Sequence, residues 1–305
     1  MALRFDGRVA IVTGAGGGLG RAHALALAAR GAKVVVNDLG GALDGSGSAL
    51  TAAERVVGEI RAAGGEAIAD GASVTDYRAV EAMVAAAKSK WGRIDILVNN
   101  AGILRDKTFA KMELADFRAV LEVHLMGSVH CCKAVWEPMR EQNYGRIVLT
   151  TSSSGLFGNF GQSNYSAAKM GLVGLMQTLG LEGEKYNIRV NCLAPTAATR
   201  MTDNLMPPEV LALMKPEAVS PAVLAMAGED APNRAILNAG ANGFERTYVI
   251  MTHGVHIPLG PDTPDQVAVR LDEISDRDGA TLPQNAGGQG AVELGKAGSS
   301  RTTRK

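Results

Sequence analysis

The chain has 305 residues and balances 31 lysines and arginines against 31 aspartates and glutamates, so its formal net charge is zero. That length suits one large α/β domain or two small ones. The balanced charge argues against the strongly basic surfaces that draw proteins to nucleic acid or to anionic membranes, so we expect neither partner.

The sequence lacks the signals of a secreted, membrane-spanning, peroxisomal or zinc-binding protein. No stretch has the pattern of a signal peptide, and no apolar run approaches the ~20 residues that span a bilayer. The chain ends in RTTRK, which is not a peroxisomal address. The three cysteines, Cys131, Cys132 and Cys192, fit neither a disulfide framework nor a zinc site. These observations predict a cytoplasmic protein without a metal site.

Six short apolar runs alternate with helical patterns over the first 200 residues. The runs are VAIVTG, KVVVND, EAIADG, IDILVNNAG, GRIVLTTSS and IRVNCLAP. Runs rich in Val and Ile and bounded by Gly, Asn or Asp are typical of buried strands in a parallel sheet. Helices between such strands imply right-handed crossovers. The sequence therefore predicts an α/β fold, with a single Rossmann-type, doubly wound parallel sheet flanked by helices.

The composition changes near residue 260. Before that point, a Gly- and Ser-rich loop follows the second predicted strand and leads into a helix from about Thr51. After it, TPDQVAVRLDEIS predicts a helix over 263–275. From about Asp278 the chain is rich in Gly, Ser, Gln and Thr, which is typical of a flexible tail or of an arm that a partner orders. We predict a main domain over 1–260 and a C-terminal extension, a helix followed by a flexible tail, over 261–305.

The octet TGAGGGLG, residues 13–20, joins the first predicted strand to the first helix. Its glycines permit a tight turn and a close approach of the backbone to a pyrophosphate, and the helix N-terminus attracts the negative charge. The spacing is Gly-x-x-x-Gly-x-Gly over Gly14, Gly18 and Gly20, and no Lys-Ser or Lys-Thr follows. A triphosphate-binding P-loop is therefore disfavoured. The alternative is a structural turn without a ligand.

Asp38 ends the second predicted strand, eighteen residues after Gly20. A carboxylate at that place accepts hydrogen bonds from the ribose hydroxyls of an adenosine and repels a 2′-phosphate. The pattern therefore predicts NAD, rather than NADP, as the cofactor. The alternative is that Asp38 only caps the following loop.

Tyr165 and Lys169 are four residues apart in SNYSAAK, so they share one face of a helix. A lysine ammonium one turn away stabilises a phenolate and makes the tyrosine a usable acid and base. Ser152 lies at the end of the strand thirteen residues earlier and is placed to hydrogen-bond the substrate oxygen. The three residues suit the interconversion of a secondary alcohol and a ketone, with NAD carrying the hydride. The alternative for the Tyr–Lys pair is ordinary surface packing.

In their order along the chain, the glycine turn, Asp38, NNAG, Ser152 and the Tyr–Lys pair resemble the short-chain dehydrogenase/reductases over about residues 5–255. The resemblance implies that Ser152, Tyr165 and Lys169 are catalytic, with His124 where the family usually has a catalytic asparagine. The cofactor contacts that it implies are Gly14, Gly18, Leu19, Gly20, Asp38, Ser73, Val74, Asn100, Ala101, Gly102, Tyr165, Lys169, Pro195 and Thr199. A backbone-bonded core histidine is the alternative for His124.

Longer strings, among them VHLMGS and YGRIVLTTSSSGLFGNFGQSNYSAAK, resemble one subgroup. It comprises the (3R)-hydroxyacyl-CoA and 17β-hydroxysteroid dehydrogenase domains of peroxisomal multifunctional enzymes and their stand-alone bacterial relatives. The resemblance implies an acyl-CoA or steroid substrate and a homodimer or homotetramer. The candidates for a basic rim that binds CoA phosphates are Arg105, Lys107, Lys111 and Arg200. The alternatives are an NAD-linked reductase of another carbonyl, such as a 3-oxoacyl thioester, and a non-catalytic nucleotide-binding scaffold.

Overall fold

The computed structural model describes residues 2–41, 50–198 and 207–302, and the chain divides into two compact units, Met1–Thr247 and Tyr248–Lys305. The strands of the first unit are β1 (Val9–Thr13), β2 (Lys33–Asn37), β3 (Ala67–Asp70), β4 (Ile96–Asn99), β5 (Gly145–Thr150), β6 (Ile188–Thr196), β7 (Ile236–Gly240) and β8 (Gly243–Thr247). Its longer helices are α1 (Gly18–Ala28), α2 (Thr51–Ala62), α3 (Tyr77–Trp91), α4 (Leu114–Leu121), α5 (Gly127–Glu141), α6 (Ser153–Phe157), α7 (Ser163–Gly183), α8 (Pro208–Leu213) and α9 (Ser220–Ala227). Short helical turns are η1 (Phe109–Lys111), η2 (Glu122–Met126), η3 (Glu184–Tyr186) and η4 (Pro216–Ala218).

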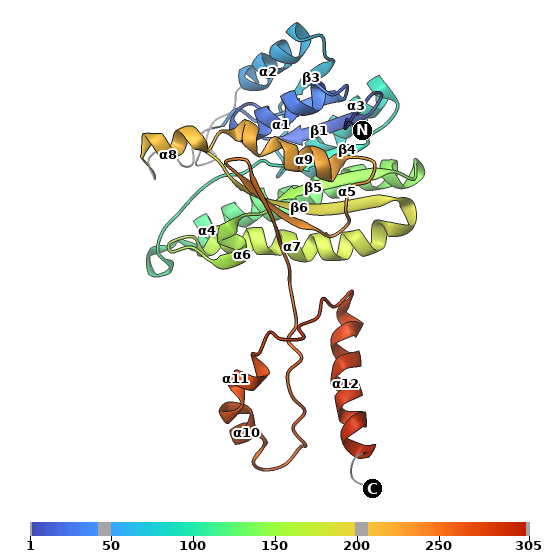
Figure 1. The fold of residues 1–305 in the computed structure, drawn as a ribbon. Coiled ribbons are helices and arrows are strands. Elements are labelled where there is room, and N and C mark those ends of the chain that lie inside the picture. Colours follow the sequence, from blue (N-terminus) through green and yellow to red (C-terminus); the bar gives the residue numbers. More distant parts are fainter. Residues whose placement is uncertain (1, 42–49, 199–206, 303–305) are drawn as a thin grey trace. The chain divides into compact units, whose positions relative to one another are not determined.

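All eight strands form one sheet, in the order β3-β2-β1-β4-β5-β6-β7-β8 (Figure 1). Strands β1 to β7 pair in parallel, and β8 alone pairs antiparallel to its neighbour β7. The six strands expected from the sequence are β1 to β6, and the doubly wound Rossmann-type fold is confirmed.

The last two strands were not expected, although the chain carries part of a signal for them. Ala241 and Asn242 form a two-residue hairpin turn with φ angles of 48° and 63°. Two positive φ angles are typical of a type I′ turn, for which Asn-Gly is the preferred sequence. The central residues here are Ala241 and Asn242, of which only asparagine is favoured at positive φ, so the sequence carries only part of the usual hairpin signal.

Alternate residues of the strands pack into two separate apolar cores, one on each face of the sheet. Val12, Val34 and Ile96 face the core that α1, α2 and α9 cover. Ile11, Val35 and Leu97 face the core that α3, α5 and α7 cover. Both faces are buried because parallel strands need crossover helices on each side, which explains why the strand sequences are almost continuously apolar.

Replacing the buried His23 of α1 should remove part of the acid sensitivity of the fold. Burial lowers the pKa of His23 to about 3, and its Nδ1 lies 2.9 Å from Ser220 Oγ. The unfolded chain takes up a proton below about pH 6.5 and the folded chain does not. This contribution to stability is therefore present above about pH 6.5 and lost as the pH falls toward 3. Between pH 7 and 4.5 it amounts to about 3 kcal/mol.

Urea unfolding of His23→Gln and of wild type at those two pH values would measure this loss. We expect the free energy of unfolding to fall less in the variant, whereas the same substitution at the exposed His256 should leave the fall unchanged. Equal falls in His23→Gln and wild type would contradict the assignment.

The second unit contains the helices α10 (Thr263–Val269), α11 (Leu271–Ile274) and α12 (Ala286–Thr302). The helix expected over 263–275 is thus divided at Arg270. A flexible tail was expected after Asp278, whereas the structure has the helix α12 there, although its sequence is rich in glycine. The division of domains at residue 260 stays a prediction, since the two compact units meet at Tyr248. Among the described residues, no helix has both the length and the apolar character needed to cross a membrane.

Candidate active site

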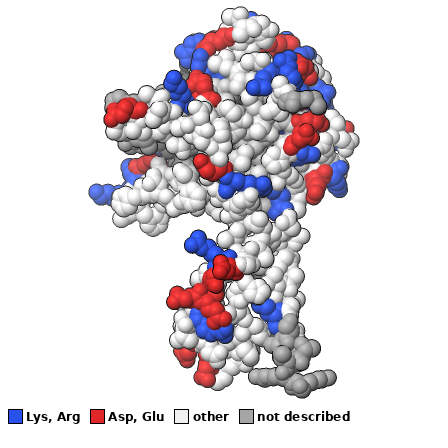
Figure 2. Space-filling view, viewed as in Figure 1, with Lys and Arg blue, Asp and Glu red and all other residues white. Residues whose placement is uncertain are grey.

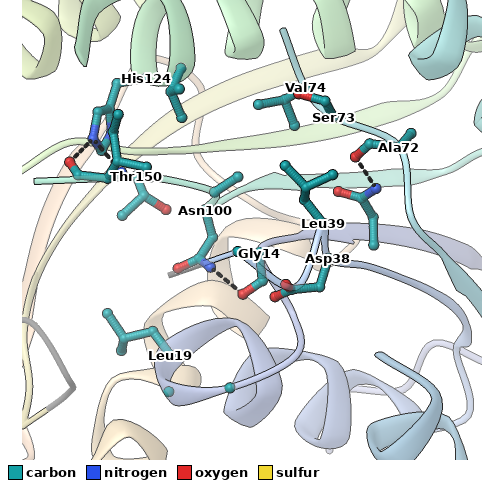
Figure 3. Close-up of a pocket in the computed structure, with 18 of the residues that line it drawn as sticks. Gly14, Leu19, Asp38, Leu39, Ala72, Ser73, Val74, Asn100, His124 and Thr150 are labelled. Atoms are coloured by element: carbon teal, nitrogen blue, oxygen red, sulfur yellow. Dashed lines mark hydrogen bonds between the residues drawn. The ribbon is translucent and has the colours of Figure 1, made fainter. Parts of the chain in front are cut away.

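A cleft of about 240 Å³ lies at the carboxyl ends of the central strands (Figure 3). The strand order reverses between β1 and β4, and such a switch point opens a crevice in doubly wound sheets. Asp38 and the segment 72–74 line one end, and His124 and Thr150 line the other. The fold therefore supplies one elongated cleft whose two ends carry different chemistry.

The cleft brings together most of the residues singled out from the sequence. Those that line it are Gly14, Gly18, Leu19, Asp38, Ser73, Val74, Asn100, Ala101, Gly102, His124, Tyr165, Lys169 and Pro195. Gly20 and Ser152 lie just behind the lining, where Gly20 packs on the Gly14 carbonyl and Ser152 bonds to Tyr165. Thr199 falls outside the described residues.

The glycine turn and the NNAG segment hold each other in place. Gly14 has a φ of +63°, and a Cβ on it would lie 2.8 Å from Ala101 Cα, so only glycine fits there. The amide Nδ2 of Asn100 donates to the carbonyls of Thr13 and Gly14 at 3.0 and 3.1 Å. In return, Thr13 Oγ1 accepts the N–H groups of Asn100 and Ala101. The start of α1 is thereby fixed at the cleft wall with its free N–H groups available to an anion.

The carboxylate of Asp38 is held at the end of β2 by two backbone N–H groups. Gly16 N and Gly40 N each donate to it at 2.7 Å. Next to it, Asn37 Nδ2 donates to Asp70 Oδ1 and to the Ala72 carbonyl at 2.7 and 2.9 Å. Those bonds fix the segment that carries Ser73 and Val74 across the cleft. A glycine cradle at a helix N-terminus with a carboxylate at the second strand fits a dinucleotide.

At the other end, Lys169 lies one helical turn after Tyr165 on α7. Its Nζ lies 5.4 Å from the centroid of the Tyr165 ring and donates to the Thr150 carbonyl at 2.5 Å. Burial lowers the pKa of Lys169 to about 7. At neutral pH, the lysine beside the tyrosine is therefore close to its own pKa.

Burial raises the pKa of Tyr165, while a hydrogen bond from Ser152 lowers it and the charge of Asp106 raises it. Ser152 caps α6 by accepting the Ser154 N–H at 3.1 Å. Because burial disfavours the phenolate, ionisation of Tyr165 depends on the Ser152 donor and on the neighbouring Lys169 cation.

His124 lies in a π-helical turn, η2, between α4 and α5. Its Nε2 is 2.8 Å from the carbonyl oxygen and 3.1 Å from the nitrogen of Ile103. The ring packs edge-on against Tyr165, with the centroids 5.1 Å apart and the planes at 90°. Burial first, and the Lys169 charge second, lower the pKa of His124 well below its usual value. Its Nδ1 is buried without a hydrogen-bond partner among the described residues. A neutral His124 therefore supports the tyrosine ring and the Ile103 backbone.

Some lining residues were missed by the sequence analysis: Gly17, Asn37, Leu39, Gly41, Ala72, Ile103, Val123 and Thr150. Thr150 and Ala72 accept hydrogen bonds through their carbonyls, and a carbonyl contact leaves no trace in residue type. Three of them had an indirect signal: Gly17 lies within the octet at 13–20, Asn37 directly precedes Asp38, and Thr150 directly precedes Thr151-Ser152 at the end of a predicted strand.

The expected basic rim is only partly available. Asp116 Oδ1 lies 3.0 Å from Arg105 Nη1, and its Oδ2 lies 3.4 Å from Lys107 Nζ. Lys111 is exposed, and Arg200 falls outside the described residues. Over the face of the first unit in view, acidic and basic side chains are interspersed, with no broad area of one sign (Figure 2). That pattern agrees with the balanced charge of the sequence.

The fold and site together define an α/β enzyme with a dinucleotide-type cleft and a Tyr–Lys pair at one end. The model of the family described as short chain dehydrogenase matches residues 8–209. The chain therefore belongs to the short-chain dehydrogenase family, whose members are oxidoreductases.

Individual relatives agree with this assignment. A Mycobacterium tuberculosis protein named as a short-chain type dehydrogenase/reductase is 50% identical over 276 residues, which cover 90% of this chain and 96% of that protein. The structure of full-length peroxisomal multifunctional enzyme type 2 from Drosophila melanogaster matches 96% of this chain with a TM-score of 0.78 and 37% identity. This chain spans only 49% of that one. The resemblance to the family and to these multifunctional enzymes is thus confirmed.

A further solved structure is a 7α-hydroxysteroid dehydrogenase in complex with NADH and 7-oxo glycochenodeoxycholic acid. It matches 79% of this chain and 95% of its own with a TM-score of 0.71 and 32% identity.

Proposed function

We propose that the protein is an NAD-dependent oxidoreductase that interconverts a secondary alcohol and a ketone, with (3R)-hydroxyacyl-CoA as the substrate class. The observation that carries this proposal is the shape of the cleft. Ser152, Tyr165 and Lys169 gather at one end, and Asp38 stands at the other. A substrate oxygen and an adenosine ribose would thereby be held at opposite ends of one bound cofactor.

The chain offers a set of contacts to the cofactor along the whole cleft. The N–H groups at the start of α1 would hold the pyrophosphate, and Asp38 would accept the adenosine ribose hydroxyls. Ser73 and Val74 would border the adenine, and Lys169 is long enough to reach the nicotinamide ribose. When bound, NAD supplies the hydride acceptor and, in its oxidised form, a positively charged ring. Pro195 and the proposed contact Thr199 would lie near the nicotinamide.

The proton would move at the Tyr165 hydroxyl. During oxidation the phenolate takes the proton of the substrate alcohol, and during reduction the hydroxyl returns it. Ser152 donates a hydrogen bond that holds the substrate oxygen next to Tyr165. The protonated Lys169 favours the phenolate through its charge, and the Thr150 carbonyl fixes the position of that charge. His124 would assist by holding the tyrosine ring.

Replacing Asp38 with serine should weaken NADH binding by roughly 10- to 100-fold, the value of one or two hydrogen bonds to a charged group. NADPH binding should strengthen relative to NADH, because the carboxylate no longer repels the 2′-phosphate. Fluorescence titration of both nucleotides would measure the ratio. Asp38→Asn is the matched control, since it keeps the size and removes only the charge. Unchanged selectivity in both variants would locate the discrimination elsewhere in the cleft.

The substrate class rests on the multifunctional enzyme relative and on the long shared strings. A hydroxysteroid is the second candidate, because the 7α-hydroxysteroid dehydrogenase shares the fold at 32% identity. Two further readings stay open as alternatives. One is the reduction of another carbonyl, such as a 3-oxoacyl thioester, and the other is a non-catalytic nucleotide-binding scaffold.

The test is to mix the purified chain with NAD and follow NADH absorbance with (3R)-hydroxyacyl-CoA, (3S)-hydroxyacyl-CoA and 17β-estradiol in separate wells. Turnover confined to the (3R)-thioester supports the proposal. Turnover of the steroid alone would make a hydroxysteroid, rather than (3R)-hydroxyacyl-CoA, the substrate class. If every well stays flat while NADH binds, the proposed substrates are wrong and the cofactor assignment stands.

We also propose a homodimer or homotetramer in the cytoplasm. Membership of the short-chain dehydrogenase family supports the oligomer. Light scattering of the full chain gives the mass, and a monomer at micromolar concentration would contradict the oligomer.

A further inference from the structure

The loop before α4 is fastened to the loop before α7, directly ahead of Tyr165. Three hydrogen bonds join the segment 105–107 to the segment 161–164. They are Lys107 N to the Gly161 carbonyl at 3.0 Å, Gln162 Nε2 to Asp106 Oδ2 at 2.6 Å, and Asn164 Nδ2 to the Arg105 carbonyl at 3.0 Å. The bond between Gln162 and Asp106 joins two side chains. The Gln162 amide also belongs to a longer chain of hydrogen bonds.

That chain runs from Asp106 to the reacting residues. Gln162 Oε1 accepts the Ser154 hydroxyl at 2.8 Å, and the Ser154 N–H donates to Ser152 Oγ at 3.1 Å. Ser152 in turn bonds to Tyr165. Gln162 donates to Asp106 and accepts from Ser154, whereas Ser154 donates in both directions, through its hydroxyl to Gln162 and through its N–H to Ser152. The orientation of the Gln162 amide therefore determines how Ser154 and the first turn of α6 are held.

We propose that Gln162, anchored by Asp106, is a positioning residue that holds Ser152 as a hydrogen-bond donor toward the Tyr165 oxygen. Ser152 Oγ accepts the Ser154 N–H, which leaves its own proton for Tyr165 or for the substrate oxygen. Neither Asp106 nor Gln162 touches the reacting atoms in this scheme. The expected change in kcat rests on the proposed function. The expected change in the titration of Tyr165 does not.

The charged and titratable groups around Tyr165 determine how its pKa responds to a substitution. Lys169 faces it from the same helix, the neutral His124 packs on its ring from η2, and Asp106 faces it from the loop before α4. Of these, only Asp106 carries negative charge, and it raises the pKa of Tyr165. The geometry therefore links an exposed carboxylate to Tyr165 through Gln162, Ser154 and Ser152.

The experiment follows the ¹³Cζ resonance of Tyr165 in the full chain from about pH 7 to about pH 11, the range in which tyrosines begin to ionise. The chain has 5 tyrosines, and Tyr165→Phe assigns the signal. We expect Gln162→Met to move the titration of Tyr165 to higher pH, because Ser152 is then no longer held as a donor toward the Tyr165 oxygen. Gln162→Glu should move it to higher pH, because two carboxylates then face each other. Asp116→Asn is the matched control, because it removes a carboxylate near the loop before α4 that makes no bond to Gln162, Ser154 or Ser152, and it should titrate as wild type.

Kinetics with the substrate found above add a second readout. Gln162→Met keeps the size but breaks the three side-chain bonds, to Asp106, Ser154 and Asn159. The value of kcat should fall about tenfold with the KM for NAD unchanged, as expected when a reacting group is slightly misplaced. For Gln162→Glu, the ratio of its kcat to that of wild type should rise as the pH falls and one carboxyl becomes protonated. If Tyr165 titrates identically in every variant, the proposal is overturned. Because the titration needs no turnover, failure of the proposed substrate leaves this test decisive.

Discussion

Replacing Tyr165 with phenylalanine should lower kcat by about 10²- to 10⁴-fold, the range that one positioned acid and base contributes. The substitution removes only the hydroxyl that bonds to Ser152, and it keeps the ring that packs on His124 at 5.1 Å. The fold and the binding of NADH should therefore survive. Steady-state kinetics and NADH fluorescence on the same preparation measure the two quantities.

Tyr186→Phe is the matched control, because that hydroxyl bonds to Arg140 outside the cleft. It should leave kcat unchanged. Turnover of Tyr165→Phe at the wild-type rate would assign proton transfer to another group. If a biological output persisted without any turnover, the scaffold alternative would be favoured instead.

Replacing Lys169 with methionine should abolish most turnover and, at the same time, stabilise the fold. Burial lowers the pKa of the lysine from 10.5 to about 7, so below pH 7 the folded protein carries a buried cation at a cost of about 5 kcal/mol. Methionine removes that cost but leaves the Thr150 carbonyl without its donor, which costs about 1–3 kcal/mol. We expect the free energy of unfolding to rise by about 2–4 kcal/mol near pH 6.

The pH dependence of that gain has a definite sign. Between pH 7 and pH 10.5 the unfolded lysine binds a proton that the folded lysine has lost, so wild-type stability rises with pH over that range. The stability advantage of Lys169→Met over wild type should therefore be widest below pH 7, shrink as the pH rises, and reverse before pH 10.5, where the lost bond to Thr150 is the remaining difference. Urea unfolding across this range measures it. A variant less stable than wild type at pH 6 would show that Lys169 contributes to the fold more than its burial costs.

The sites that the sequence located are those in which residue type and spacing carry the chemistry. Only glycine accommodates the φ of Gly14 and its contact with Ala101, so the turn is visible in the sequence. The proposed ribose contact needs a carboxylate, and a tyrosine proposed as an acid and base needs a cation one helical turn away, so residue type and spacing were enough to propose Asp38, Tyr165 and Lys169. The alternation of strands and helices predicted the parallel sheet for a similar reason, because both faces must be apolar.

The tertiary structure decided what depends on contacts between segments far apart in the chain. The Thr150 carbonyl that holds Lys169 is a backbone atom, which no residue type announces. Whether His124 reaches the substrate or supports Tyr165 depends on the turn η2 and on Ile103, twenty-one residues away. The bond between Asp106 and Gln162 spans 56 residues. Residue type and local spacing fix the chemical identity of a group, whereas its hydrogen-bond partners, its burial and hence its pKa are fixed only when the chain packs.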